Sequence, residues 1–113
     1  MNPGTVPRKR KHLYILDGKN RPVEVFDFSE WSRWMSGNDR VFRRTLMEES
    51  GVTVTTRFRG ASEAGIGEAQ LFVTGVAGMQ EQNNEGLRSN TLDDALEKHE
   101  RIVQKILRVL TGR

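Results

Sequence analysis

The chain has 113 residues and a formal net charge of +3, and 35% of its residues are hydrophobic. This length fits one small domain, and the absence of cysteine excludes disulfide bonds, thiol catalysis and cysteine-ligated zinc. No apolar run approaches the roughly 20 residues that cross a bilayer, so we expect a cytoplasmic protein without a membrane-spanning segment.

The positive charge is concentrated near the N-terminus. Four consecutive cations lie there: Arg8, Lys9, Arg10 and Lys11. They leave residues 12–113 slightly acidic. Residues 1–11 also contain Pro3 and Pro7 and show no apolar periodicity, so they are predicted to form a disordered basic arm. Such an arm either remains solvated or contacts a polyanion.

A β-hairpin is predicted over residues 12–25. Residues 12–16 are a β-type run, and the Asp-Gly pair at 17 and 18 suits a hairpin turn. Val23-Glu24-Val25 alternates beyond the turn, and Pro22 stands at the strand entrance, where a missing N–H is tolerated.

A short helix is predicted over residues 28–36. Asp27 is a suitable N-cap, and Phe26 is placed to pack against Trp31 as a hydrophobic staple. Gly37 is a natural stop.

Three further strands are expected over residues 40–47, 52–60 and 69–76. In the second of them β-branched and aromatic residues alternate with a period of two, which is the clearest strand pattern in the chain. The intervening residues 60–68 and 78–90 are predicted to be loops.

The last element is an amphipathic helix that begins after Thr91, an N-cap residue. Its apolar stripe contains Leu92, Ala95, Leu96, His99, Ile102, Val103, Ile106 and Leu110. Gly112 marks the end of the helix.

These elements predict an α+β fold in one domain over residues 12–113. Short turns between sequential strands favour an antiparallel sheet of three or more strands, packed by two helices. The hairpin at 12–25 extends or flanks this sheet. An exposed sheet edge could be covered by homodimerisation.

His99 is the most tempting catalytic candidate, because it lies on the apolar stripe of the last helix. A lone histidine in such a stripe is more often packed and hydrogen-bonded to a neighbouring strand, so we predict a structural role. No metal-ligand spacing surrounds it. We therefore predict no catalytic residue, no metal site and no cofactor.

Arg57 and Arg59 share the polar face of the central strand, and one or two of Arg40, Arg43 and Arg44 could join them if residues 40–47 pair with this strand. Such a patch could bind phosphate backbones together with the basic arm. Carboxylates available to neutralise it are Glu48, Glu49, Glu63 and Glu68. Trp34 is a candidate partner-binding residue, with core packing as its alternative.

Short motifs in a characteristic order run from about Tyr14 to Val103. They are Tyr14-Ile15-Leu16-Asp17-Gly18, Pro22-Val23-Glu24-Val25, Trp31-Ser32-Arg33-Trp34, Asp39-Arg40-Val41, Val52-Thr53-Val54-Thr55-Thr56-Arg57-Phe58-Arg59-Gly60 and Leu71-Phe72-Val73-Thr74. In these motifs the chain resembles a family of small uncharacterised proteins of tailed bacteriophages and prophage-bearing bacterial genomes. Relatives typically carry Gly-Leu-Asp-His where this chain has Gly60-Ala61-Ser62-Glu63. The resemblance implies no activity.

The leading hypothesis is a non-enzymatic phage or prophage accessory protein that binds a partner protein and thereby could inhibit a host process or defence. The alternative is a nucleic-acid-associated protein that uses the arm at 8–11 together with Arg57 and Arg59. An enzyme built around His99 ranks third.

Overall fold

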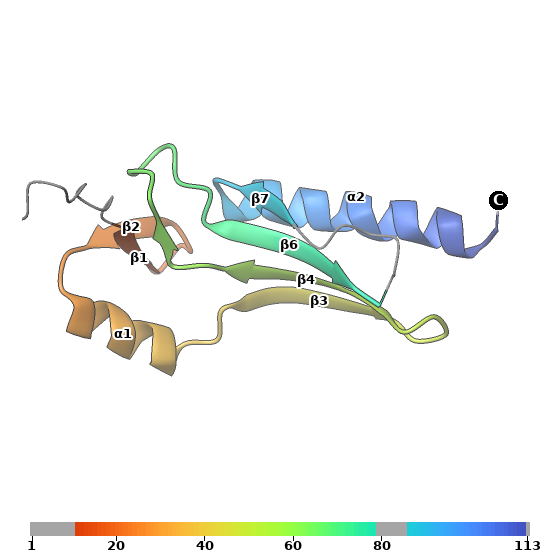
Figure 1. Cartoon of the computed structure of the whole chain (residues 1–113), viewed down its shortest axis with the longest axis horizontal. Coiled ribbons are helices and arrows are strands. Elements are labelled where there is room, and N and C mark those ends of the chain that lie inside the picture. The colour runs from red at the N-terminus through yellow and green to blue at the C-terminus, as the bar shows by residue number, and fades with distance from the viewer. Residues whose placement is uncertain (1–10, 79–85, 113) are drawn as a thin grey trace, which may run out of the picture.

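The computed structural model describes residues 11–78 and 86–112. Within them the chain forms two antiparallel sheets and two helices, which confirms the predicted α+β fold (Figure 1). In chain order the elements are β1 (His12–Leu16), β2 (Pro22–Val25), α1 (Phe28–Gly37), β3 (Val41–Met47), β4 (Val52–Phe58), β5 (Ala61–Ser62), β6 (Phe72–Ala77), β7 (Leu87–Ser89) and α2 (Leu92–Leu110).

Gly60 lies where the larger sheet meets the smaller one. Strands β3, β4, β6 and β7 form the larger sheet in that order, whereas β2, β1 and β5 form the smaller one. The chain leaves β4 and enters β5 through Gly60, whose φ is +80°. The Gly60 carbonyl accepts hydrogen bonds from the Tyr14 backbone N–H and the Trp31 indole N–H, both at 2.8 Å. Gly60 therefore connects both sheets and α1.

The strands agree with the sequence predictions only in part. The hairpin at 12–25 is confirmed, and it flanks the larger sheet instead of extending it. Two segments predicted to be loops contain short strands, β5 and β7. The third predicted strand begins at Phe72, three residues later than expected.

Both helices begin as their sequences predict. The Asp27 side chain accepts a hydrogen bond from the Ser29 N–H at 2.9 Å, and the Thr91 hydroxyl accepts one from the Asp94 N–H at 3.1 Å. These caps satisfy N–H groups that have no partner inside the helix.

The predicted staple at the start of α1 is wrong. Phe26 is 89% exposed, and the ring of Phe28 contacts Trp31 instead, with centroids 5.6 Å apart. Gly37 also lies inside α1, with Asn38 as the C-cap. The sequence has the residues of a hydrophobic staple. Phe28 contacts Trp31 in place of Phe26, because residues three apart are neighbours on a helix surface.

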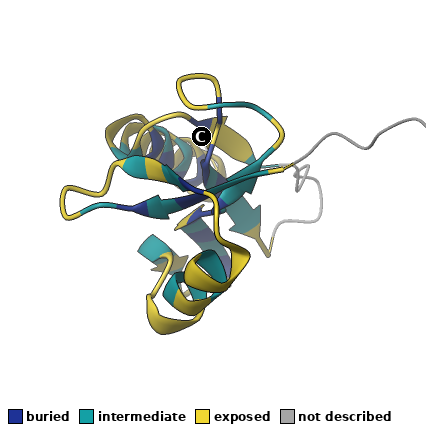
Figure 2. Ribbon diagram, turned by 90° about the vertical axis from the view of Figure 1, so that its left-hand side faces the viewer, coloured by how far each residue is buried: buried dark blue, intermediate teal, exposed yellow. Residues whose placement is uncertain are grey.

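Two apolar clusters fill the core, and a polar layer lies between them. The first cluster is centred on Tyr14, Phe58, Leu71, Phe72 and Ala95, and the second contains Val52, Val54, Val103 and Ile106. The polar layer consists of Thr45, Thr56, Thr74 and His99. Along β4, Val54 belongs to the second cluster, Thr56 to the polar layer and Phe58 to the first cluster. Along α2, Val103, His99 and Ala95 belong to the same three layers in the same order. Figure 2 shows buried segments between the sheets and α2, while α1 has no buried residue.

Helix α2 covers one face of the larger sheet, where it contacts β4, β6 and β7. The buried side chains of β4 are Val52, Val54, Thr56 and Phe58, so the intervening residues point to the opposite face. No helix among the described residues packs on that opposite face. An open sheet face is therefore available for binding.

The edges of the larger sheet are β3 and β7. Strand β3 has a register irregularity between Val41 and Arg43 and exposes Arg43 and Arg44, which are features that oppose pairing with another chain. Strand β7 has three residues. Homodimerisation through an edge stays a prediction, and the charges on β3 disfavour that edge.

Candidate functional site

His99 lies in the polar layer under α2. It is fully buried, and both ring nitrogens have partners: Nε2 is 2.8 Å from the Thr45 hydroxyl and Nδ1 is 2.8 Å from the Thr56 hydroxyl. The prediction that His99 is packed and hydrogen-bonded to neighbouring strands is confirmed. His99 lines none of the three hollows described below.

The hydrogen bonds of this layer have one consistent direction. Thr74 Oγ1 lies 2.6 Å from Thr56 Oγ1 and donates to the Ala95 carbonyl at 3.5 Å. A carbonyl can only accept, so Thr56 donates to Thr74 and in turn accepts from His99 Nδ1–H. Nε2 then accepts from Thr45. The layer therefore favours neutral His99 with its proton on Nδ1.

The surroundings of His99 also oppose its protonation. Burial, and secondly the positive charge of Arg43, lower the pKa of the imidazole, while Glu100 acts weakly in the opposite direction. A neutral imidazole with both nitrogens occupied has no free atom with which to act as a general base.

The open face of the larger sheet carries a cluster of arginines. Arg57 on β4 is paired with Val73 on β6, and Val73 is paired with Arg88 on β7, so the three side chains share that face. The adjacent row contains Arg44, Thr55 and Gly75. Arg59 follows Arg57 on the same face. We call Arg44, Arg57, Arg59 and Arg88 the arginine face.

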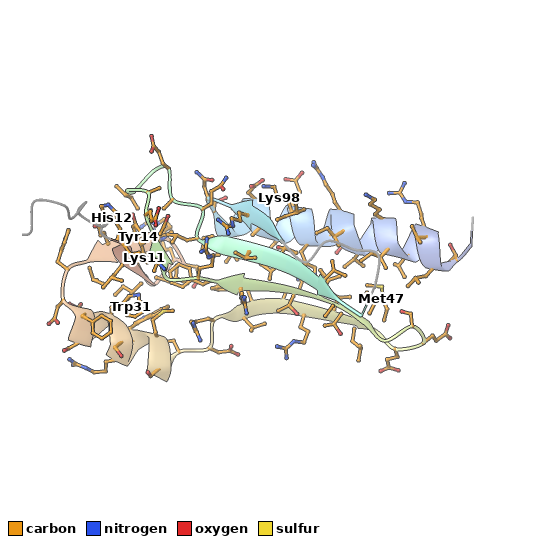
Figure 3. All side chains as sticks on the ribbon, in the orientation of Figure 1. Lys11, His12, Tyr14, Trp31, Met47 and Lys98 are labelled. Carbon is orange, nitrogen blue, oxygen red and sulfur yellow. The ribbon has the colours of Figure 1, made fainter. Side chains whose placement is uncertain are left out.

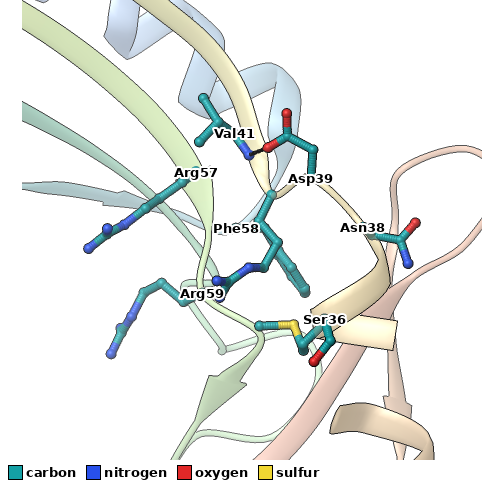
Figure 4. Close-up of a pocket in the computed structure, with 9 residues that line it drawn as sticks. Ser36, Asn38, Asp39, Val41, Arg57, Phe58 and Arg59 are labelled. Atoms are coloured by element: carbon teal, nitrogen blue, oxygen red, sulfur yellow. Dashed lines mark hydrogen bonds between the residues drawn. The ribbon is translucent and has the colours of Figure 1, made fainter. Parts of the chain in front are cut away.

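Three hollows meet at this cluster. The first, of about 640 Å³, lies between the end of α1 and β4, and Figure 4 shows Arg57 and Arg59 extending from it side by side. The second, of about 440 Å³, lies beside residues 61–68, and the third, of about 530 Å³, lies over the open face. Arg59 lines all three. All four arginines line the third hollow, and no acidic residue among the described ones does so.

Carboxylates do lie close to the arginine face: Glu63 and Glu68 line the second hollow with Arg59 and Arg88, and Asp39 lines the first hollow with Arg57 and Arg59. Within residues 11–78 and 86–112, no ion pair joins these guanidinium groups to a carboxylate. Glu48 and Glu49 lie in the β3–β4 turn, at the far end of the strands from Arg57. Burial, and then the charges of Arg88 and Arg57, lower the pKa of Arg59. These positive charges therefore repel one another, and an anion would relieve that repulsion.

The structure brings together part of the predicted nucleic-acid surface. Lys11 lines the second hollow with Arg59 and Arg88, and Figure 3 places Lys11 beside β1 at one end of the molecule, with Met47 at the other. Arg57 and Arg59 are adjacent, as expected. Arg8, Lys9 and Arg10 lie outside the described residues.

The arginines of β3 divide between the two faces. Arg44 joins the arginine face, whereas Arg43 pairs with Thr56 and influences His99 from the other side. Arg40 lines only the first hollow, together with Asp39.

Trp34, the predicted partner-binding residue, packs against the core. Its ring meets Phe58 edge to face, with centroids 5.8 Å apart, and the side chain is only half-exposed. A ring in this arrangement contributes to packing. This contact agrees with core packing, the alternative given for Trp34, and a role of Trp34 in partner binding stays a prediction.

Arg88 was missed by sequence reasoning, because it lies in the polar segment predicted to be a loop. Its only local signal is the short run Leu87-Arg88-Ser89 between Gly86 and the helix cap, which is too short to identify a strand. Arg88 becomes part of a surface only when β7 pairs with β6.

No cluster of three or more possible metal-binding side chains occurs in the part of the chain that the structure describes. None of its helices combines the length and apolar character needed to span a membrane. A comparison with protein-family models, curated proteins and solved structures finds no match to this chain.

Proposed function

We propose that the protein binds nucleic acid through the phosphate backbone, with the arginine face as its contact surface. One observation carries this proposal: four guanidinium groups converge over the open face of the larger sheet, and no carboxylate lines that hollow among the described residues. Arginine donates hydrogen bonds in a planar fork that matches phosphate oxygens. The function is one of binding, and His99 takes no part in it.

The N-terminal arm supports the same proposal. Lys11 lines the second hollow together with Arg59 and Arg88, and three further cations precede Lys11 in the sequence. Together these groups supply the salt-dependent attraction that dominates non-specific nucleic-acid binding. This assignment favours the alternative hypothesis from the sequence over the leading one, and it is compatible with the predicted cytoplasmic location.

Replacing Arg57 and Arg59 by glutamine tests the proposal. In a fluorescence-anisotropy titration with a labelled 20-base-pair duplex, we expect the R57Q/R59Q variant to bind roughly tenfold more weakly at 50 mM salt. The slope of log affinity against log salt concentration should become shallower by about 1.8, because each lost phosphate contact removes about 0.9.

The R33Q/K105Q variant is the matched control. It changes the net charge by the same amount at exposed positions of α1 and α2, so it should retain nearly all of the affinity. An equal loss in the two variants would show that overall charge, and not the arginine face, determines binding. Absence of duplex binding by the unaltered protein at 50 mM salt would contradict the proposal.

A partner protein is the second candidate, and exposed aromatic residues favour it. Phe26 is 89% and Phe28 is 65% exposed at the start of α1, which is unusual for side chains of this size. We infer that, in a phage-encoded accessory protein, this pair contacts an apolar patch on a host protein.

The F26S/F28S variant tests this second candidate. It should lose a host protein that the unaltered chain captures from nuclease-treated lysate, and its duplex affinity should stay unchanged. Capture of the same protein by both forms would exclude the phenylalanine pair as the contact.

A further inference from the structure

We propose that the arginine face recognises double-stranded nucleic acid in preference to single strands, and that it does so without reading the bases. This inference rests on the proposed function and names its substrate class. It follows from the chemistry of the side chains that surround the arginines and from the spacing of the strands that carry them.

The surface around the arginines offers no aromatic platform. Proteins that bind single strands usually stack the bases on exposed aromatic rings. None of the described residues that line the third hollow is aromatic: they are Arg44, Thr53, Thr55, Arg57, Arg59, Val73, Gly75, Val76, Ala77, Gly86 and Arg88. Phe58 lines the first hollow, but it is 1% exposed and belongs to the core. An unstacked base would therefore find no ring on which to lie.

Small side chains form most of the floor of the third hollow. Thr53, Thr55, Gly75 and Ala77 occupy adjacent positions on β4 and β6, and a Cβ added at Gly75 would meet no atom within 4 Å. The guanidinium groups extend beyond these small side chains, and Leu46, which is paired with Thr53 and 55% exposed, lies on the same face. Among the described residues, the side chains that line this hollow therefore present little steric barrier to a rigid, convex polyanion such as a duplex.

The spacing of the arginines suits two phosphate strands. Arg57 and Arg88 lie on β4 and β7, with β6 between them. Neighbouring strands are about 4.8 Å apart, so these two backbone positions are about 10 Å apart. Long, flexible arginine side chains can adjust from this backbone separation to the minor-groove or major-groove width of a B-form duplex, about 6 and 12 Å. Two long side chains at this distance can contact phosphates on both sides of one groove.

The first arm of the test compares nucleic acids of equal length. The unaltered protein is titrated with a 20-base-pair duplex, with each of its separate strands and with a second duplex of unrelated sequence. We expect the duplex to bind about tenfold or more tightly than either strand at equal salt, and the two duplexes to agree within about threefold.

The second arm places a negative charge in the centre of the face. A Cβ added at Gly75 would have open space, and Thr55 on β4 is paired with Gly75 on the same face. The Gly75→Glu variant should lose tenfold or more of its duplex affinity, whereas the isosteric Gly75→Gln variant should keep it within about threefold. Thr55→Glu and Thr55→Gln repeat the comparison if the first pair changes the melting temperature.

The outcomes distinguish the inference from the function on which it rests. Single strands that bind as tightly as the duplex, with arginine dependence, would overturn the duplex preference and leave nucleic-acid binding in place. Strong discrimination between the two duplex sequences would overturn the absence of base reading. If the protein bound polyglutamate but neither the duplex nor the single strands, both the duplex preference and the proposed nucleic-acid binding would be wrong.

Discussion

Replacing Gly60 by alanine is expected to lower the free energy of unfolding by about 2–4 kcal/mol. Gly60 has a φ of +80°, a region in which a Cβ is strained. The new Cβ would also lie 2.5 Å from Met35 Cε, the end of a flexible side chain that can shift, and 3.3 Å from Trp31 Nε1, which is tighter than an ordinary contact. The indole cannot retreat without stretching its hydrogen bond to the Gly60 carbonyl. Both backbone strain and a steric conflict therefore oppose the substitution.

Two other glycines separate these causes in urea-unfolding measurements. Gly51→Ala meets a positive φ of +72° in open space, so it should show backbone strain alone, about 1–2 kcal/mol. Gly75→Ala has neither problem and should be neutral or slightly stabilising, because glycine weakens a strand interior. If Gly60→Ala destabilised no more than Gly51→Ala, the contact with Met35 and Trp31 would have no energetic importance.

The second large effect is expected at His99. His99→Gln should lower the free energy of unfolding by about 1–3 kcal/mol, because glutamine cannot place two polar atoms where the imidazole nitrogens contact Thr45 and Thr56. His12→Gln is the control. His12 is half-exposed beside Glu24, so its replacement should change stability by less than about 1 kcal/mol.

The same histidine should make stability depend on pH. Its pKa is lowered in the folded protein, while the unfolded chain takes up a proton near pH 6.5. As pH falls below 6.5 the unfolded state binds more protons than the folded state, so stability falls with it and is fully present only above that pH. The difference in stability between the unaltered protein and His99→Gln should therefore shrink from pH 7.5 to pH 5. A constant difference would show that His99 titrates alike in both states.

A double-mutant cycle identifies the hydrogen-bond chain as the cause. Thr56→Val removes the hydroxyl that contacts both His99 and Thr74. If the chain acts as a unit, the two substitutions together should destabilise less than the sum of their separate effects, by about 0.5 kcal/mol or more. Additive effects would indicate that His99 contributes through packing alone.

The helices and the long strands could be predicted because local signals determine them. Asp27 and Thr91 act as caps through contacts within three residues. The alternation of residue types along β4 shows directly which side chains lie on each face of the strand. Strands β5 and β7 could not be predicted, since two and three residues carry no readable period. The division into two sheets depends on a turn in the chain at Gly60, and the sequence shows only a glycine there.

The candidate site was predicted in the same uneven way. Alternation placed Arg57 and Arg59 on one face, whereas the contributions of Arg44 and Arg88 depend on the register of neighbouring strands. The spacing of Trp34 in the sequence did not show whether its ring packs on the core or is exposed, because either face of a short helix can pack against the rest of the protein. Local patterns thus identified part of the surface, and non-local pairing completed it.

The polar layer beneath α2 has a consequence for how the protein can respond to a ligand. If α2 slid by one turn, His99 would move to the position of Ala95 or Val103, among apolar side chains and without its threonine partners. A buried polar group without hydrogen bonds is costly, so that second arrangement is not a competing minimum. Sliding elements that switch between two packings need such a competing minimum. Ligand binding on the open face should therefore leave α2 in place. Any effect of the ligand would then depend on its occupying the open face and not on a conformational change of the protein.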